Sequence, residues 1–282
     1  MFFGATCFAI TPFCPSSCSC GRMQAMSAAE ASLARISASR SPQDAIAAFA
    51  GGALPHTILS CCQGALLAMF STQDVLPLRA TCRDAVAAVA AHPWDDLETV
   101  ICGNVGPALR KARVRGHKPQ RGAWRACFPR AVGANLTEVQ ADDGSPWRRR
   151  AVVDADLAHL KGLRRLVMSA CNRVTGAAFV HLAGIQSLDM SLCDQGCITD
   201  AAFAHLAGIK ILRMQWCRQA AITDAAFVHL AGIQSLDMSG CSQVTITDAA
   251  FVSLVGIKQL DMRGCAPGLI DAARAAGLPI SL

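Results

Sequence analysis

The C-terminal half of the chain alternates between two hydrophobic patterns. Phe203, Leu206 and Ile209 fall at the spacing of an apolar helix face, behind a Thr-Asp pair of the kind that begins helices. Leu212 and Met214 then alternate with other residues, which is the period of a strand. We therefore expect a short helix followed by a short strand.

This helix–strand unit recurs along the sequence. The segment Thr-Asp-Ala-Ala-Phe begins at residues 199, 223 and 247, and degenerate copies begin near 153 and 175. The threonines are 24 residues apart, and residues 177–191 are identical to residues 225–239. One such unit cannot bury its own apolar face, so the pattern predicts a stacked array with a continuous core.

The unit resembles a known repeat family. Its second copy reads Ile185-x-x-Leu188-x-Met190-x-x-Cys193, which is similar to the L-x-x-L-x-L-x-x-C pattern of cysteine-containing leucine-rich repeats. The resemblance covers residues 152–282. It implies an α/β solenoid with a parallel concave sheet and convex helices.

The chain has 15 cysteines, and five recur at one position of the repeat. In a stacked array their Cα atoms lie roughly 5 Å apart, which is within reach of a disulfide. Each occupies the same inward position of its own unit, so we expect buried thiols. The five are Cys171, Cys193, Cys217, Cys241 and Cys265.

Candidate binding residues are those that the repeat does not require, on the strands that face the concave side. A column of charged positions runs through Asp189, Arg213, Asp237 and Asp261, and Trp216 stands where other units have leucine or glycine. Trp and Arg are frequent interface hot spots. One alternative is that the column only neutralises itself, although adjacent like charges at 237 and 261 cost stability. The predicted substrate-binding set is Asp189, Arg213, Gln215, Trp216, Asp237, Asp261 and Arg263.

A different pattern occupies residues 54–83. It opens with Leu-Pro, continues as an apolar helix, and ends in Asp-Val-Leu-Pro-Leu-Arg-Ala-Thr-Cys-Arg. This resembles an F-box, a small helical module that docks on the Skp adaptor of a cullin–RING ubiquitin ligase. An ordinary helical cap on the solenoid is the alternative. The resemblance implies that adaptor contacts or module core come from Leu54, Pro55, Ile58, Leu59, Val75, Leu76 and Leu78.

The remaining segments carry fewer signals. The net charge of +6 arises in residues 110–150, where 11 Lys and Arg face 3 Asp and Glu, so this stretch is either a solvated connector or a contact for an anionic partner. Residues 45–73 hold no charge, but glycines and a proline interrupt them, which favours buried helices over a membrane span. With aromatics at 5%, a base-stacking surface is not expected.

These patterns predict five consecutive regions. They are a disordered or wrongly assigned leader at 1–25, a linker or helix at 26–50, the F-box-like module at 51–96, a basic connector with room for one degenerate repeat at 97–150, and about five repeats with a C-terminal cap at 151–282.

Motifs of catalysis are missing from the sequence. It contains no P-loop, G-x-G-x-x-G, G-x-S-x-G or H-E-x-x-H segment, so we expect no active site, cofactor or metal. The leading hypothesis is a cytoplasmic or nuclear F-box substrate receptor that recruits an unknown protein substrate to a Skp–cullin complex by proximity. The alternatives are a repeat scaffold without a ligase and, more weakly, a nucleic-acid binder.

Overall fold

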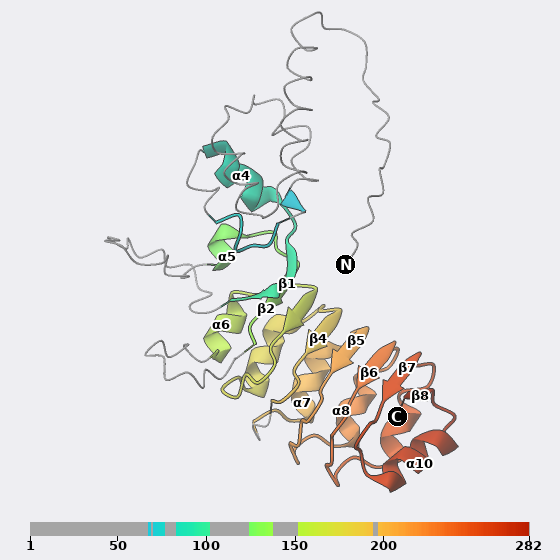
Figure 1. The fold of residues 1–282 in the computed structure, drawn as a ribbon. Helices are drawn as coiled ribbons and strands as arrows, with labels where there is room; N and C mark the ends of the chain where they lie inside the picture. Colours follow the sequence, from blue (N-terminus) through green and yellow to red (C-terminus); the bar gives the residue numbers. More distant parts are fainter. Residues whose placement is uncertain are drawn as a thin grey trace, which may run out of the picture. The chain divides into compact units, whose positions relative to one another are not determined.

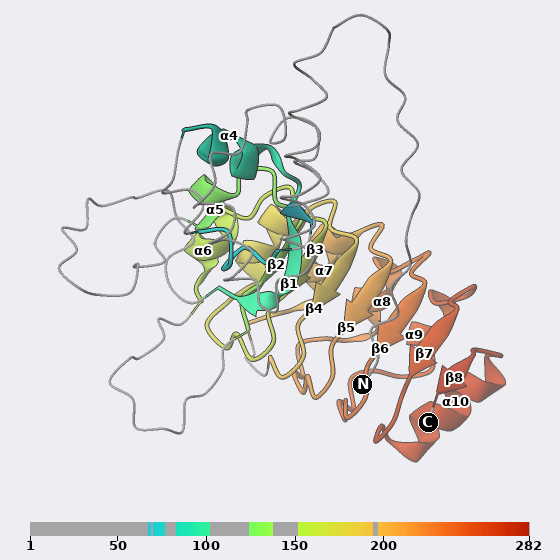
Figure 2. The same ribbon diagram turned by 45° about the horizontal axis from the view of Figure 1, so that its top comes forward.

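The computed structural model of the 282-residue chain describes residues 67–68, 70–76, 83–101, 124–137, 152–193 and 197–281. The chain divides into two compact units, Met1–Gln63 and Gly64–Leu282, and all described residues lie in the second. Figures 1 and 2 show this unit as a row of strands with helices beside it.

The strands form one parallel sheet in sequence order. They are β1 (Asp95–Val100), β2 (Gly133–Asn135), β3 (Arg165–Val167), β4 (Ser187–Asp189), β5 (Ile211–Arg213), β6 (Ser235–Asp237), β7 (Gln259–Asp261) and β8 (Ile280–Ser281). From β3 to β7 the same repeat position pairs across each neighbour, as at Leu188, Leu212 and Leu236.

Short helices follow the strands along the chain. They are α4 (Arg83–Ala91), α5 (Trp124–Cys127), α6 (Asp154–Ala158), the 3-10 helix η2 (Gly176–Leu182), α7 (Asp200–Phe203), the 3-10 helix η3 (Ala204–Leu206), α8 (Asp224–Val228), α9 (Ala249–Val252) and α10 (Pro267–Ala275). No helix in the described ranges is both long and apolar enough to cross a bilayer.

This regular stack of strand and helix in 24-residue units is a leucine-rich-repeat solenoid, which confirms the fold expected from the repeats. The sheet also extends N-terminal to the repeats, where β2 lies within the expected connector and β1 was not anticipated. Residue Asp95 of β1 forms an ion pair with Arg165 of β3.

The core consists of columns in which each unit contributes the same side chain. Strand leucines and methionines meet helix phenylalanines there, and all are almost completely buried. Burying one such side chain stabilises the fold by about 1.5–3 kcal/mol. The columns include Leu188, Leu212, Leu236 and Leu260; Met190, Met214, Met238 and Met262; and Phe179, Phe203, Phe227 and Phe251.

The five cysteines of the repeat column are buried, as expected from their inward position in each unit. Each sulfur donates a hydrogen bond to a backbone carbonyl of the preceding unit. Cys217 bonds to Met190 at 3.2 Å and Cys241 to Met214 at 3.0 Å. Burial, the largest cause, raises the pKa of Cys241 to about 12, so the thiol stays protonated and unreactive at neutral pH.

Units are also joined by a bond that the sequence analysis did not foresee, which we call the Asp–Thr clamp. The Asp200 carboxylate accepts hydrogen bonds from the backbone N–H and the hydroxyl of Thr223, both at 2.7 Å. Asp154 holds Thr175 in the same way, and Asp224 holds Thr247. The Thr-Asp pair therefore does more than begin a helix: the aspartate connects its unit to the next.

Candidate functional site

One backbone position after each strand adopts a left-handed conformation. Ala170, Leu192 and Trp216 have φ near +60°, and Gly240 and Gly264 have φ near +70°. The N–H of each of the middle three bonds to the next unit, as from Trp216 to the Ser239 carbonyl at 2.8 Å. A residue with a side chain is strained in this conformation, by roughly 1–2 kcal/mol.

Trp216 adopts this strained conformation, and half of the residue's surface is exposed to solvent. Its indole lies over Gly240, where an added Cβ would come within 2.6 Å of the ring. The Arg218 guanidinium lies 5.4 Å from the ring centre, which is a cation–π distance. Leu192, at the preceding position of the same column, is 52% exposed. The exposed pair Leu192 and Trp216 therefore forms an apolar step at the ends of β4 and β5.

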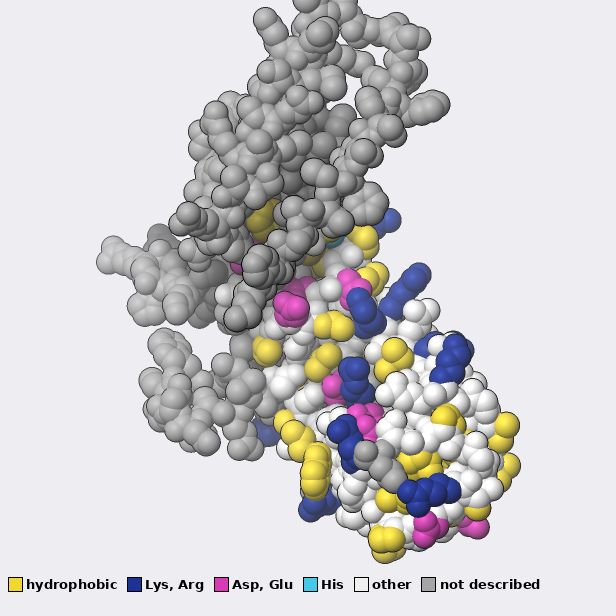
Figure 3. All heavy atoms as spheres, turned by 45° about the vertical axis from the view of Figure 1, so that its right-hand side comes forward, with side chains coloured by type: hydrophobic (Ala, Val, Ile, Leu, Met, Phe, Trp, Pro, Cys, Tyr) yellow, Lys and Arg dark blue, Asp and Glu magenta, His cyan; other side chains and the backbone are white. Residues whose placement is uncertain are grey.

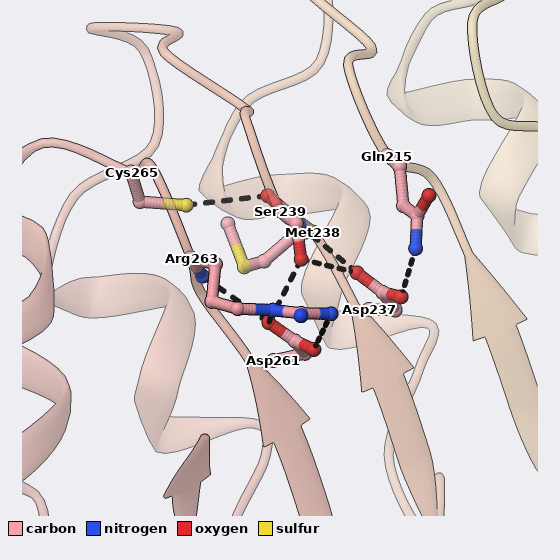
Figure 4. Close-up of polar contacts among 7 residues, drawn as sticks. All are labelled: Gln215, Asp237, Met238, Ser239, Asp261, Arg263 and Cys265. Atoms are coloured by element: carbon pink, nitrogen blue, oxygen red, sulfur yellow. Dashed lines mark hydrogen bonds and ion pairs between the residues drawn. The ribbon is translucent and has the colours of Figure 1, made fainter. Parts of the chain in front are cut away.

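Beside this step lies a hydrogen-bonded polar network, shown in Figure 4. The Ser239 hydroxyl lies 2.7 Å from Asp237 and 2.8 Å from Asp261, so it stands between the two carboxylates. Gln215 donates its side-chain amide to Asp237, and Arg263 pairs with Asp261 at 2.7 Å. The segments at the ends of β5, β6 and β7 thus contribute to one connected surface.

The two carboxylates of this network differ in what they offer a partner. Asp261 is buried and paired with Arg263. Burial tends to raise the pKa of Asp261, but hydrogen bonds from the Arg263 side chain and the Ser239 hydroxyl hold the pKa below its ordinary value. Asp237 is half-buried, and within the described ranges no cation pairs with it. It is therefore the carboxylate left for an external donor.

The shared hydroxyl adds a second argument for that donor. Ser239 has one hydroxyl proton, so it can donate to only one carboxylate at a time. The remaining close contact places two acceptor oxygens together, a repulsive arrangement unless a proton or an external donor intervenes. Asp261 has Arg263, whereas among the described residues Asp237 accepts only the neutral donors Gln215 and the Ser239 N–H besides this hydroxyl, so an additional donor at Asp237 would relieve the contact.

The column does not neutralise itself through Arg213. Asp189, Arg213 and Asp237 are direct neighbours across β4, β5 and β6. Even so, Arg213 forms no ion pair with any residue that the structure describes. Asp189 instead accepts from Ser169 at 3.2 Å and from the Ser191 N–H at 3.0 Å. Arg213 is exposed and remains open to a partner.

The molecular surface reflects this mixture of chemistry. Figure 3 shows acidic, basic and hydrophobic side chains side by side on one face of the described part. Such a mixture of hydrophobic side chains with charged groups of both signs is typical of protein interfaces. Within the described residues, no group of three or more His, Cys, Asp or Glu is placed to hold a metal.

Comparison with known proteins adds the following. No protein-family model matches the chain, and no curated protein matches it significantly. Among solved structures, a TLR13–ssRNA13 complex aligns with 49% of this chain and 22% of the TLR13 chain, at 15% identity and a TM-score of 0.36. The Toll–Spatzle complex of Drosophila aligns with 52% of this chain and 26% of that one, at 10% identity and a TM-score of 0.30. The alignments span about a quarter of those chains.

The predicted adaptor-binding residues are only partly described. Val75 is fully buried and Leu76 is half-buried. Next to them, Thr72 donates its N–H and its hydroxyl to Asp96 of β1, at 2.7 and 2.8 Å. This part of the segment is therefore bonded to the first strand of the sheet. Leu54, Pro55, Ile58, Leu59 and Leu78 lie outside the described residues.

All seven predicted substrate-binding residues lie at or just after strands β4 to β7, and six of them belong to the features above. Two contributors were missed from the sequence. Leu192 looked like an ordinary repeat position, although its place in the Ala, Leu, Trp, Gly, Gly column was a signal for a left-handed turn. Ser239 gave no signal, because its role depends on the proximity of two strands.

Proposed function

We propose that this protein is a non-catalytic interaction receptor whose strand-end surface binds a protein partner. This interface consists of Leu192, Arg213, Trp216 and Asp237, and it is connected through hydrogen bonds and an ion pair to Gln215, Ser239, Asp261 and Arg263. The observation that carries the proposal is Trp216, a half-exposed indole at a strained position where two other units have glycine. Strain that the fold does not need is most easily explained by function.

The side chains of this surface indicate which chemical groups a partner would present to them. An apolar side chain would pack on Trp216 and Leu192, and a basic group or N–H donor would reach Asp237. Burying a large aromatic at the centre of an interface typically accounts for much of the binding energy. An acidic group on the partner would pair with Arg213.

We further propose, from the resemblance of residues 54–83 to an F-box, that the receptor belongs to a Skp–cullin ubiquitin ligase. The burial of Val75 is compatible with a place in the module core. The bonds from Thr72 to Asp96 suit equally the alternative, a scaffold with a helical cap and no ligase. The nucleic-acid alternative rests on residues 110–150, of which only 124–137 are described.

The interface is tested by comparing proteins captured by the full-length chain and by its Trp216→Gly variant. Glycine is native at this position in two other units, so the variant keeps the turn while losing the indole. The matched control is Val228→Ala, which trims an exposed valine on α8. We expect a partner that the wild type and Val228→Ala retain and Trp216→Gly loses. Equal capture by all three would refute the interface.

The ligase connection needs a separate experiment. Full-length chain is co-expressed with a Skp-type adaptor, alongside a Leu54→Ala/Leu76→Ala variant shown by circular dichroism to fold. Co-purification that the double variant loses would support the ligase. A folded wild type that does not bind the adaptor would leave the scaffold alternative, and affinity for nucleic acid that falls steeply with salt would favour the third.

A further inference from the structure

The structure contains a cavity at the C-terminal end of the repeats, remote in sequence from the apolar step. It has a volume of about 400 Å³ and lies between the loop after Cys241 and the first turns of α10. Its wall includes Gln243, Val244, Thr247, Asp248, Leu269 and Ala272. We call it the end cavity. Its volume is within the range of roughly 300–1,000 Å³ that is usual for ligand sites.

The end cavity lies where the array is interrupted. In the preceding unit, five residues lie between Cys241 and Thr247, and Thr245 of this loop donates to the Ile222 carbonyl of the unit before it. After Cys265 the helix α10 already begins at Pro267, so most of the corresponding loop is missing. The space that a further loop would occupy stays open above residues 242–248.

The same interruption leaves the last Asp–Thr clamp unfilled. Asp154, Asp200 and Asp224 each hold a threonine of the following unit. The residue 24 positions after Thr247 is Asp271, which lies in α10 and pairs with Arg274. Asp248 consequently has no threonine to hold, and its carboxylate accepts no hydrogen bond within the described part of the chain.

A second, independent feature of the cavity is the side-chain amide of Gln243. Both of its polar atoms are buried, and neither forms a hydrogen bond. One repeat earlier, Gln219 donates its amide to the carbonyl of Cys193. A buried amide without partners is destabilising and needs an explanation. A bound peptide group supplies one, because it has the N–H and the carbonyl that an amide side chain complements.

We propose that the end cavity binds an extended peptide segment of another protein, which takes the place of the missing loop. A serine or threonine of that segment presents its N–H and hydroxyl to Asp248, in the geometry of the three clamps. The Gln243 amide bonds to the segment's backbone. The site shares no residue with the Trp216 interface, so either proposal can fail without the other.

Among the described residues, the threonines of this protein's own clamps are already in use, and we therefore assign the occupant to a different chain. Thr175, Thr223 and Thr247 are each held within the array. Thr199 faces Gly176 instead of an aspartate, but it lies in the middle of a continuous stack. A free segment rich in serine or threonine has no such constraint.

The probe is a synthetic peptide with the sequence of residues 242–252, which contains the two threonines that a further unit would supply. In the protein, Thr245 donates to the Ile222 carbonyl at 2.7 Å and Thr247 binds Asp224. Affinity of full-length protein for the labelled peptide is measured by fluorescence anisotropy. We expect saturable binding, and at least about ten-fold weaker binding to Asp248→Asn, because charged hydrogen bonds are lost.

Three controls make the result specific. Asp271→Asn removes a nearby carboxylate outside the cavity and should bind like the wild type. A peptide with valine at both threonines should lose binding. Gln243→Leu should bind the peptide several-fold more weakly while raising the unfolding temperature, since it removes a buried unpaired amide.

Each of three results would overturn the proposal. They are an absence of saturable binding at millimolar peptide, equal affinity for wild type and Asp248→Asn, and equal affinity for the threonine and valine peptides. The Asp248 carboxylate accepts no hydrogen bond within the described part of the chain, so Asp248→Asn is expected to keep the wild-type circular dichroism spectrum. Gln243→Leu gives a second test through a different element of the site.

Discussion

The strained turn at Trp216 makes a prediction about stability that reverses the usual order of two substitutions. Trp216→Gly and Trp216→Ala both delete the indole with its contacts to Gly240 and Arg218. The variants therefore differ in how well their backbones tolerate φ of +56° and in how much backbone freedom they lose on folding. Alanine is destabilised at this φ because of its Cβ atom, whereas glycine is not.

The magnitude follows from two opposing effects. A residue with a Cβ is disfavoured in the left-handed region by roughly 1–2 kcal/mol. Glycine is less favourable than alanine by roughly 0.5–1 kcal/mol because it loses more backbone conformational entropy on folding. The difference between the two ranges is roughly 0–1.5 kcal/mol, so we expect Trp216→Gly to be more stable than Trp216→Ala by about 0.75 kcal/mol.

The assay is urea unfolding of the full-length variants followed by circular dichroism. The control pair is Val228→Gly and Val228→Ala, at an exposed position of α8 with ordinary helical geometry. Val228 is the last residue of α8, so alanine should be the more stable there by up to about 1 kcal/mol, the difference found in a helix interior. Alanine that is more stable than glycine at both positions would refute the strain argument, and with it the main reason for assigning Trp216 to function.

Three further predictions concern the clamps, the thiols and the buried carboxylate. Asp200→Ala removes a clamp and should lower the unfolding free energy, measured by urea unfolding, by about 1.5–3 kcal/mol. Asp248→Ala removes a carboxylate that forms no clamp with any described residue and should change it by less than about 0.5 kcal/mol. Equal effects of the two substitutions would contradict the stabilising role of the clamp. Burial raises the pKa of Cys241 from 9.0 to about 12, so the free energy of unfolding should fall between pH 9 and 12 by up to about 1.4 kcal/mol per pH unit. The fall should be smaller in Cys241→Ala, which has no thiol to ionise. Parallel curves of stability against pH for the two proteins would exclude this cause. The pKa of Asp261 is held low, so the stability that its carboxylate contributes is present above about pH 4 and lost as the pH falls further. The unfolding free energies of wild type and Arg263→Gln should therefore converge at acid pH. A difference between them as large at pH 3 as at pH 7 would contradict the assignment.

The repeats could be predicted from the sequence because each unit has the same local hydrophobic pattern. Leu212 and Met214 alternate as a strand requires, and Phe203 and Leu206 follow a helical spacing, so burial at these positions follows directly. The cysteine column was predictable for the same reason. β1 was not, because Asp95–Val100 is a polar segment outside the periodic region, and it is set in place by pairing with β2.

The site was only half visible for a physical reason. Trp216 and the charged column could be found as departures from the repeat. The bridge at Ser239 and the Asp–Thr clamps are formed between units, so they depend on distances that no single unit encodes. The end cavity depends on a missing loop, which becomes meaningful once the preceding loops are seen to stack.

The central claim is that a protein partner contacts the surface around Trp216, and site-specific photo-crosslinking tests it most directly. Benzoylphenylalanine is introduced at position 216 of the full-length chain in its own cells, and at position 228 of α8 as the control, followed by irradiation and mass spectrometry. We expect a defined protein adduct from position 216 that position 228 does not form, and that Asp237→Ala weakens. No adduct at 216, or the same adducts at both positions, would contradict the account.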